Sequence, residues 1–141
     1  MTDRLLIAAA AVAACAAGYL LLQSYLALRR RAVLAASAPE DEAMAGITTL
    51  LAFSTAECGR CQDQARAVAE LESRLGGKVR VRKVDALAEP ALAERYGVMT
   101  VPTTVVLDGA GRPRAVNYGF APGGKLEAQV RAVLSGEALA A

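Results

Sequence analysis

The pair Cys58 and Cys61 constrains this chain more than any other sequence feature. An apolar, partly β-branched segment, residues 47–53, precedes the pair, and a segment with helical apolar rhythm follows it to about Leu75. A Cys-x-x-Cys pair between a strand and a helix is typical of redox chemistry rather than of a metal site. Free backbone N–H groups and the helix dipole stabilise negative charge, so we expect the pKa of Cys58 to be lowered and Cys58 to be the nucleophile. Cys61, one turn later, is close enough to form a disulfide with it.

The rest of the composition excludes several chemistries. The 141 residues include three cysteines and no histidine, so schemes that use histidine as a base, including Ser-His-Asp and Cys-His hydrolases, are excluded. A structural zinc site needs about four ligands, mostly Cys and His. One chain cannot supply them, although two chains of a dimer could. The net charge of +2 gives no reason to expect nucleic-acid binding.

An uncharged apolar run occupies residues 5–28. As a helix it would be roughly 36 Å long, enough to cross a hydrocarbon core of about 30 Å. We favour an uncleaved membrane anchor, because the run is too long for an ordinary signal-peptide core and the residues before it are barely positive. Two alternatives stay open. Val12-Ala13-Ala14-Cys15 resembles a lipobox, which would make the chain a lipoprotein anchored at Cys15, and the run could be a cleaved signal peptide.

The charges that flank the run predict its orientation. Arg29-Arg30-Arg31 follow it, whereas Arg4 alone precedes it. The positive-inside rule therefore places the following domain in the cytoplasm; an extracytoplasmic domain is the alternative. Ala10, Ala14 and Gly18 recur every four residues and could pack two spans into a dimer, although such spacing arises easily by chance in an alanine-rich run.

The chain divides into an anchor with a basic flank at 1–31, a linker at 32–46 and a single domain at 47–141. The pattern in the domain predicts seven elements: a strand over 47–53, a helix to 75, a strand over 78–85, a short helix from 90, a strand ending at 107, its hairpin partner over 112–118, and a helix from about 122. This order gives a parallel pair joined by a helix, with the hairpin adding an antiparallel edge. Pro113 cannot donate to a ladder, so its strand should lie at an edge. We therefore expect an α/β fold with a central mixed sheet flanked by helices.

The apolar periodicity also predicts which side chains are buried. They are Ala65, Val68, Leu71 and Leu75 in the first helix, Leu92 and Tyr96 in the short helix, and Leu126, Val130, Val133 and Leu134 in the last. We expect Tyr96 and Phe120 to lie in the core rather than to contact a substrate.

With these elements placed, residues 47–134 resemble the thioredoxin family. Three matches carry the resemblance: Cys58-Gly59-Arg60-Cys61 after a Phe-containing strand, the segment Val101-Pro102-Thr103, and Gly119 before the last helix. The resemblance implies a thioredoxin-like fold with a cis bond before Pro102. It also implies that Cys58 attacks a substrate disulfide, that Cys61 resolves the mixed disulfide, and that the backbone of Thr100, Val101 and Pro102 pairs with the extended substrate. Protein substrates, a dithiol redox partner and no bound cofactor follow from the same resemblance.

The chain departs from the family pattern around the site. Glu57 stands where thioredoxins carry tryptophan, and Ala52 stands where they carry a buried acid, whose lysine partner would fall at Val81. Arg60 replaces their proline. We expect Glu57, Gly59 and Arg60 to tune the pair, with Arg60 favouring the thiolate and Glu57 opposing it.

The sequence thus predicts a membrane-tethered thiol–disulfide oxidoreductase. One alternative is a non-catalytic module that uses the same fold to tether a partner at the membrane. Another is a metal-handling protein. The residues do not indicate the substrate, the electron donor or the direction of electron flow.

Overall fold

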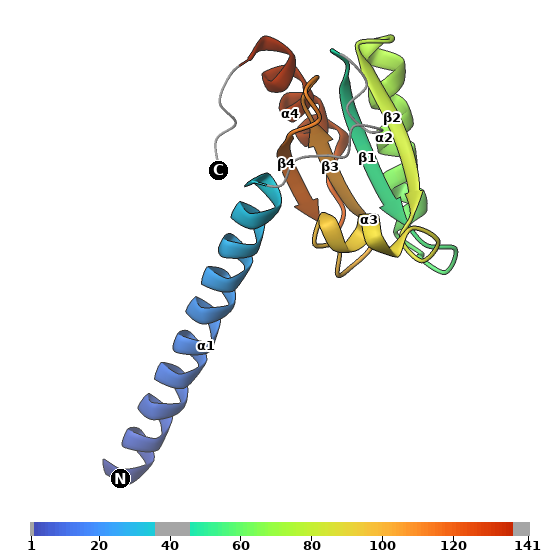
Figure 1. Cartoon of the computed structure of the whole chain (residues 1–141). Coiled ribbons are helices and arrows are strands. Elements are labelled where there is room, and N and C mark those ends of the chain that lie inside the picture. Colours follow the sequence, from blue (N-terminus) through green and yellow to red (C-terminus); the bar gives the residue numbers. More distant parts are fainter. Residues whose placement is uncertain (1, 36–45, 137–141) are drawn as a thin grey trace. The chain divides into compact units, whose positions relative to one another are not determined.

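The computed structural model describes residues 2–35 and 46–136. The chain forms two compact units, Met1–Ala32 and Val33–Ala141. Helix α1, Thr2–Ala35, is one continuous helix that covers the first unit and supplies the first residues of the second (Figure 1). Residues 32–35, which the sequence analysis assigned to the linker, are therefore helical. The rest of the predicted linker, up to residue 45, lies outside the described residues.

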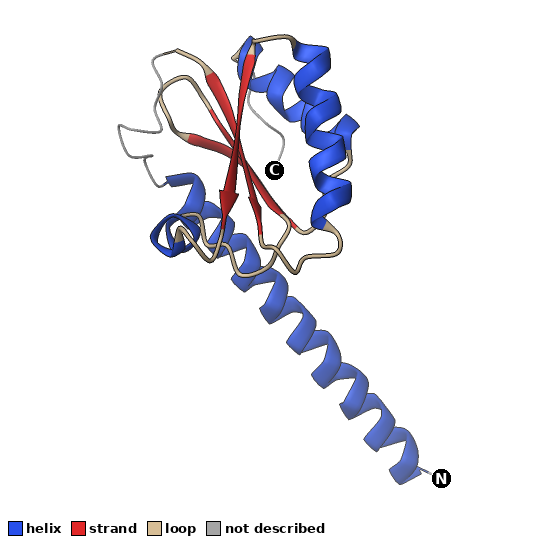
Figure 2. Ribbon diagram, turned by 90° about the vertical axis from the view of Figure 1, so that its right-hand side faces the viewer, coloured by secondary structure: helices blue, strands red, loops and turns tan. Residues whose placement is uncertain are grey.

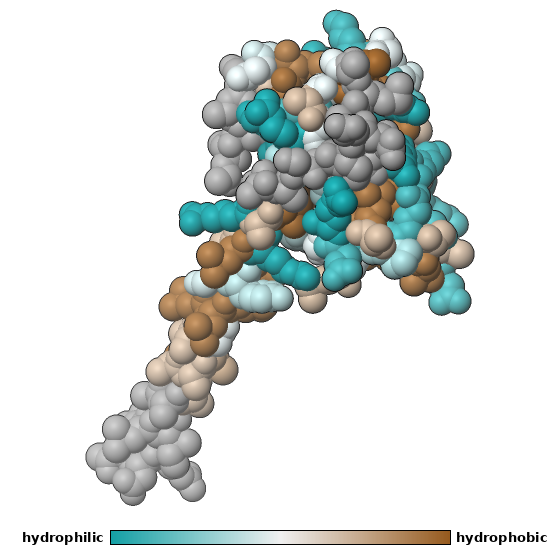
Figure 3. All heavy atoms as spheres, in the orientation of Figure 1, coloured by the Kyte–Doolittle hydropathy of each residue, from teal (hydrophilic) through white to brown (hydrophobic). Residues whose placement is uncertain are grey.

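Helix α1 contains a segment, Ala11–Val33, that is long and apolar enough to cross a membrane. This segment overlaps the uncharged run at residues 5–28, which the sequence predicts to be the span. Large apolar side chains on it are exposed, among them Val12, Leu21 and Leu28, and Figure 3 shows the hydrophobic colouring along the helix. A helix with this length and composition fits a bilayer, and a signal sequence has the same character.

The second unit is built on a four-stranded sheet in the order β2-β1-β3-β4. The strands are β1 (Thr48–Ser54), β2 (Val79–Asp85), β3 (Thr103–Leu107) and β4 (Pro113–Tyr118). Strands β1 and β2 are parallel, whereas β3 is antiparallel to both of its neighbours. The predicted mixed sheet is confirmed, and Pro113 begins an edge strand as expected.

Three helices cover this sheet. They are α2 (Cys61–Leu75), α3 (Pro90–Arg95) and α4 (Gly123–Ser135). Figure 2 shows α2 and α4 on one face and α3 on the other. Gly76, at φ 46°, ends α2 in the left-handed conformation that glycine adopts readily. The helices therefore begin and end close to the positions that the sequence predicts.

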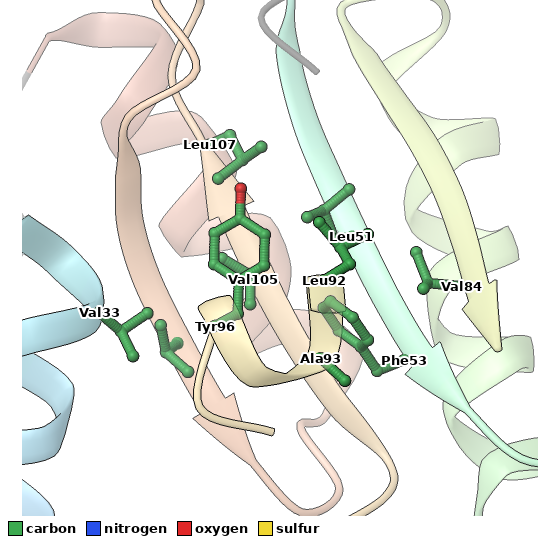
Figure 4. Close-up of a cluster of buried hydrophobic side chains, with 10 residues drawn as sticks. Val33, Leu51, Phe53, Val84, Leu92, Ala93, Tyr96, Val105 and Leu107 are labelled. Atoms are coloured by element: carbon green, nitrogen blue, oxygen red, sulfur yellow. The ribbon is translucent and has the colours of Figure 1, made fainter. Parts of the chain in front are cut away.

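The core on the α3 face surrounds two aromatic rings. Tyr96 is fully buried, and its ring centroid lies 6.0 Å from that of Phe53. The other buried members of this cluster are Val33, Leu51, Val84, Leu92, Ala93, Val105, Leu107 and Val116 (Figure 4). The predicted burial of Leu92 and Tyr96 is confirmed.

The core on the opposite face lies under α2 and α4. Its buried members are Leu50, Val68, Leu71, Leu75, Val79, Val106, Ala115, Ala121, Leu126 and Val130. Two predicted members are wrong. Ala65 is exposed, because the buried stripe of α2 passes through Gln64 instead. Leu134 is 43% exposed, because the stripe of α4 continues through the partly buried Val133 and leaves the next residue toward solvent.

The turn between β3 and β4 is organised by Asp108. One carboxylate oxygen accepts hydrogen bonds from the backbone N–H groups of Ala110 and Arg112, and the Arg112 side chain pairs with the other oxygen at 3.1 Å. Burial acts to raise the pKa of Asp108. The N–H groups of Arg112 and Ala110 and the charge of Arg112 together outweigh it and hold the pKa below its ordinary value of 3.8.

We expect Asp108→Asn to lower the free energy of unfolding at pH 7 and to have little effect at strongly acidic pH. A carboxyl with a lowered pKa stabilises the fold above its unfolded pKa, and that contribution is lost as the pH falls through the folded pKa. Urea unfolding at a series of pH values measures the difference. A difference that stays constant down to pH 2 would contradict the role of the Asp108 charge.

Candidate active site

The two cysteines lie where the chain leaves β1 and enters α2. They form a disulfide whose Cα atoms are 5.3 Å apart. Cys58 belongs to the connecting loop, and Cys61 is the first residue of α2. Two backbone hydrogen bonds tighten this loop, from Cys58 N to Thr55 O and from Cys61 N to Cys58 O. The predicted pairing and the predicted position at the helix start are both observed.

The surroundings of the two sulfurs differ. Cys58 is half-buried, whereas Cys61 is 9% exposed and packs on the first turn of α2. Within the described chain, no side chain hydrogen-bonds to the N-terminal N–H groups of α2 as a cap. Their partial positive charge is therefore left to stabilise an anion beside the helix start. The sulfur of Cys58 is therefore the one that another molecule can reach. The sulfur of Cys61 is suited to react with Cys58 inside the protein.

The segment before β3 contributes a proline to the site. The Val101–Pro102 peptide bond is cis, as the resemblance implies. Pro102 is buried and lines a small cavity together with Cys61, whereas Thr100 is exposed and Val101 is half-buried. The Thr103 hydroxyl donates to Thr100 O at 2.7 Å and fixes the turn. The structure thus brings the predicted substrate-binding segment and the redox pair to one place.

The small cavity behind Cys61 has a volume of about 30 Å³, which suits about one water molecule. Its lining residues are Ala52, Phe53, Ser54, Cys61, Gln64, Ala65, Val68, Lys83 and Pro102. The lining holds no carboxylate, in agreement with Ala52 at the position of the family's acid. The strand register places Lys83, rather than Val81, directly opposite Ala52. The sequence comparison that put the lysine position at Val81 missed this cation.

The structure also shows a buried polar contact that the sequence analysis did not find. Gln64 is 3% exposed, and its amide makes two hydrogen bonds to the backbone of Ala121. Its Nε2 donates to Ala121 O at 3.1 Å, and its Oε1 accepts from Ala121 N at 2.8 Å. This contact, the Gln64 clamp, joins the first turn of α2 to the loop after β4, which begins at Gly119 with φ 82°. A polar residue on the otherwise apolar stripe of α2 was the only sequence signal for it.

Phe120 lies in this loop directly before the clamped Ala121 and is 43% exposed. The expectation that it belongs to the core is therefore wrong. Its neighbour Ala121 is buried in its place, at 1% exposure. Successive side chains point to opposite sides here, so Ala121 enters the core and Phe120 faces solvent. Tyr96, predicted to be in the core with it, is buried.

We expect Gln64→Leu to lower the free energy of unfolding by about 1–3 kcal/mol, because it leaves the buried N–H and C=O of Ala121 without partners. Chemical denaturation of the full chain in a mild detergent measures this loss. Gln62→Leu, an exposed neighbour on the same helix, is the matched control and should change stability by less than about 0.5 kcal/mol. Equal effects of the two variants would show that the clamp contributes nothing.

A mixed sheet with a redox disulfide at a helix start and a cis-proline beside it defines the class of thioredoxin-fold thiol–disulfide oxidoreductases. The sequence model of the thioredoxin family matches residues 36–132. The chain belongs to the thioredoxin family.

Known proteins agree with this assignment. A thioredoxin of Alicyclobacillus acidocaldarius is 34% identical over 85 residues, which cover 60% of this chain and 80% of that protein. A thioredoxin of Rhodospirillum rubrum is 34% identical over 91 residues, 64% of this chain and 86% of that protein. The crystal structure of chloroplastic thioredoxin z has a TM-score of 0.61 at 25% identity and covers 70% of this chain and 91% of that chain. Family membership and the cysteine pair together identify a thiol–disulfide oxidoreductase.

Proposed function

We propose that this protein is a membrane-tethered oxidoreductase that exchanges electrons with protein disulfides and dithiols through Cys58-Gly59-Arg60-Cys61. The observation that carries the proposal is the disulfide between a half-buried Cys58 and a buried Cys61, next to the cis-proline segment. The thioredoxins among its relatives and a fungal protein disulfide-isomerase, erp38 of Neurospora crassa, support it. The latter is 42% identical over 67 residues, which cover 45% of this chain and 18% of that protein.

In the reducing direction, the Cys58 thiolate attacks one sulfur of a substrate disulfide and displaces the other as a thiolate. Cys61, as a thiolate, then attacks Cys58 and displaces the second substrate sulfur. The substrate gains two electrons and two protons, and the protein is left with its disulfide. The backbone of Thr100, Val101 and Pro102 binds the extended substrate segment beside the sulfurs. A dithiol partner restores the reduced pair.

Two charges flank Cys58 and tune this chemistry. Arg60 favours the thiolate and Glu57 disfavours it, and both side chains are exposed. Lys83 adds a cation at the cavity behind Cys61, where a carboxylate would act as a proton acceptor. A cation favours the thiolate form of Cys61 and hence the reduced state of the pair, which raises its redox potential, whereas Glu57 acts in the opposite direction.

The tether is α1, whose apolar segment is uncleaved in this proposal. The three arginines that follow its uncharged run, Arg29 to Arg31, favour a cytoplasmic position for the redox domain. A redox pair in the cytoplasm must be able to reduce its substrates. The cytoplasmic orientation therefore predicts the redox potential of a reductase.

We expect the full chain in a mild detergent to give a reversible two-electron couple near about −270 mV in dithiothreitol or glutathione buffers, the potential of a reductase. A couple near roughly −120 to −180 mV would indicate an oxidant or isomerase and would argue against the cytoplasmic orientation. Absence of any redox cycling would contradict the catalytic proposal itself.

A further inference from the structure

A groove of about 470 Å³ runs along α2 from the redox pair. Its lining residues are Arg60, Asp63, Arg66, Ala67, Glu70 and Phe120. Arg60 lies between the two cysteines in the chain, so the groove begins at the disulfide. None of these residues lines the small cavity that Pro102 shares with Cys61. The groove is therefore separate from the cis-proline side of the site.

The two arginines and two carboxylates that line the groove cancel in number, but they are not all paired with one another. Arg66 forms an ion pair with Asp63, and Glu70 lies 3.8 Å from the guanidinium of Arg74. The side chain of Arg60 is exposed and its guanidinium has no hydrogen bond or ion pair with any described residue. One guanidinium without a partner is thus left at the end of the groove that adjoins the sulfurs. The planar donor fork of arginine matches the two oxygens of a carboxylate, the acidic group of Asp and Glu side chains.

Phe120 gives the groove an apolar surface, on a loop whose backbone is anchored at the next residue. Phe120 is 43% exposed, and the Gln64 clamp holds the next residue, Ala121, against α2. A loop whose backbone is held in place before the partner arrives loses little backbone freedom on binding. The groove therefore offers an aromatic surface and an arginine side by side.

We propose that this groove binds the segment of a protein substrate that adjoins its reactive cysteine, and that this segment carries an acidic side chain for Arg60. The inference rests on the proposed function, because the mixed disulfide at Cys58 is what brings the segment to the groove. Once that bond forms, the flanking residues are held close to Arg60, and even a weak contact is made at high effective concentration. Because the ion pair is exposed to solvent, we expect the preference for an acidic flank to be about two- to fivefold.

The test uses two symmetric peptide disulfides whose sequences differ only by Glu or Gln beside the cysteine. The rate of their reduction by the reduced full chain in a mild detergent is measured at low ionic strength, and the Glu/Gln rate ratio is the readout. Any effect of a substitution on the redox potential acts on both peptides and cancels in this ratio. We expect a ratio of about two to five for the unmodified protein that declines as salt is added.

Variants of Arg60 and Glu57 test whether the Glu/Gln rate ratio arises from the groove. Arg60→Gln should reduce it to one or below, and Arg60→Lys should restore part of it. Glu57→Gln changes a charge on the other side of Cys58, outside the groove, and should raise the ratio or leave it unchanged. A ratio that Arg60→Gln does not alter would overturn the inference.

Hydroxyethyl disulfide, which is small and uncharged, separates the two hypotheses. If the protein reduces it but shows no Glu/Gln preference, the groove is not a substrate site and the proposed function stands. If the protein reduces neither hydroxyethyl disulfide nor the peptides, the proposed function fails, and this inference fails with it.

Discussion

Replacing Cys58 with serine should reduce the rate of insulin-disulfide reduction to that of the buffer control. A serine hydroxyl at neutral pH is not ionised and cannot form the mixed disulfide, so the first step of exchange is lost. The half-buried position of Cys58 makes it the sulfur that an outside disulfide can reach, and Cys61, at 9% exposure, cannot replace it. The measurement is the turbidity of reduced insulin in the presence of dithiothreitol.

Cys61→Ser is the informative partner of this variant. It keeps the attacking thiolate but removes the thiol that resolves the mixed disulfide, so turnover should stop while a covalent adduct with the substrate accumulates. Non-reducing electrophoresis detects the adduct, and Cys58→Ser should form none. If Cys58→Ser kept its activity, Cys58 would not be the nucleophile. If neither the unmodified protein nor the variant reduced insulin above the buffer control, the non-catalytic interaction module considered for this sequence would become the better hypothesis.

Replacing Phe53 with alanine should lower the free energy of unfolding by about 3–5 kcal/mol. Phe53 is 1% exposed and packs against Tyr96, which is fully buried between α3 and the sheet. Removing the ring leaves a cavity where β1 approaches the redox loop. Since whole domains are stable by about 5–15 kcal/mol, this one change would remove a large part of the total.

Leu134→Ala is the matched control for the Phe53 variant. Leu134 is also large and apolar, but it is 43% exposed at the end of α4, so its loss should change stability by less than about 0.5 kcal/mol. Urea unfolding of the full chain in a mild detergent, followed by circular dichroism, compares the two. Equal losses would contradict the distinction between core and surface drawn here.

The sequence was sufficient for the fold because its elements carry clear local patterns. The alternating valines of β2, the glycines that end α2 and the turn at Asp108 each indicate one local structure. The cysteine spacing and the later proline then locate the site without any knowledge of contacts. Even the break in the alternation of β2 has a structural meaning, because Val79 and Val84 are buried on opposite faces of the sheet.

The features that sequence reasoning missed depend on pairing between distant segments. Gln64 bonds to the backbone of a residue 57 positions away, and backbone atoms leave no trace in a sequence. Lys83 lies opposite Ala52 because of the strand register, which tertiary packing sets. An aromatic residue such as Phe120 fits a core position in the sequence, but the local direction of the loop gives that place to Ala121.

The outer strands of the sheet have a consequence for a protein that handles extended chains. An uncovered strand edge invites pairing with any other extended segment, which leads to aggregation. Strand β4 begins with Pro113, which has no N–H to offer, and β2 carries exposed cations at Arg80 and Lys83. Both margins of the sheet are thereby protected against unwanted strand addition. Under the proposed function, a partly unfolded substrate is engaged at its cysteine and released without becoming a fifth strand.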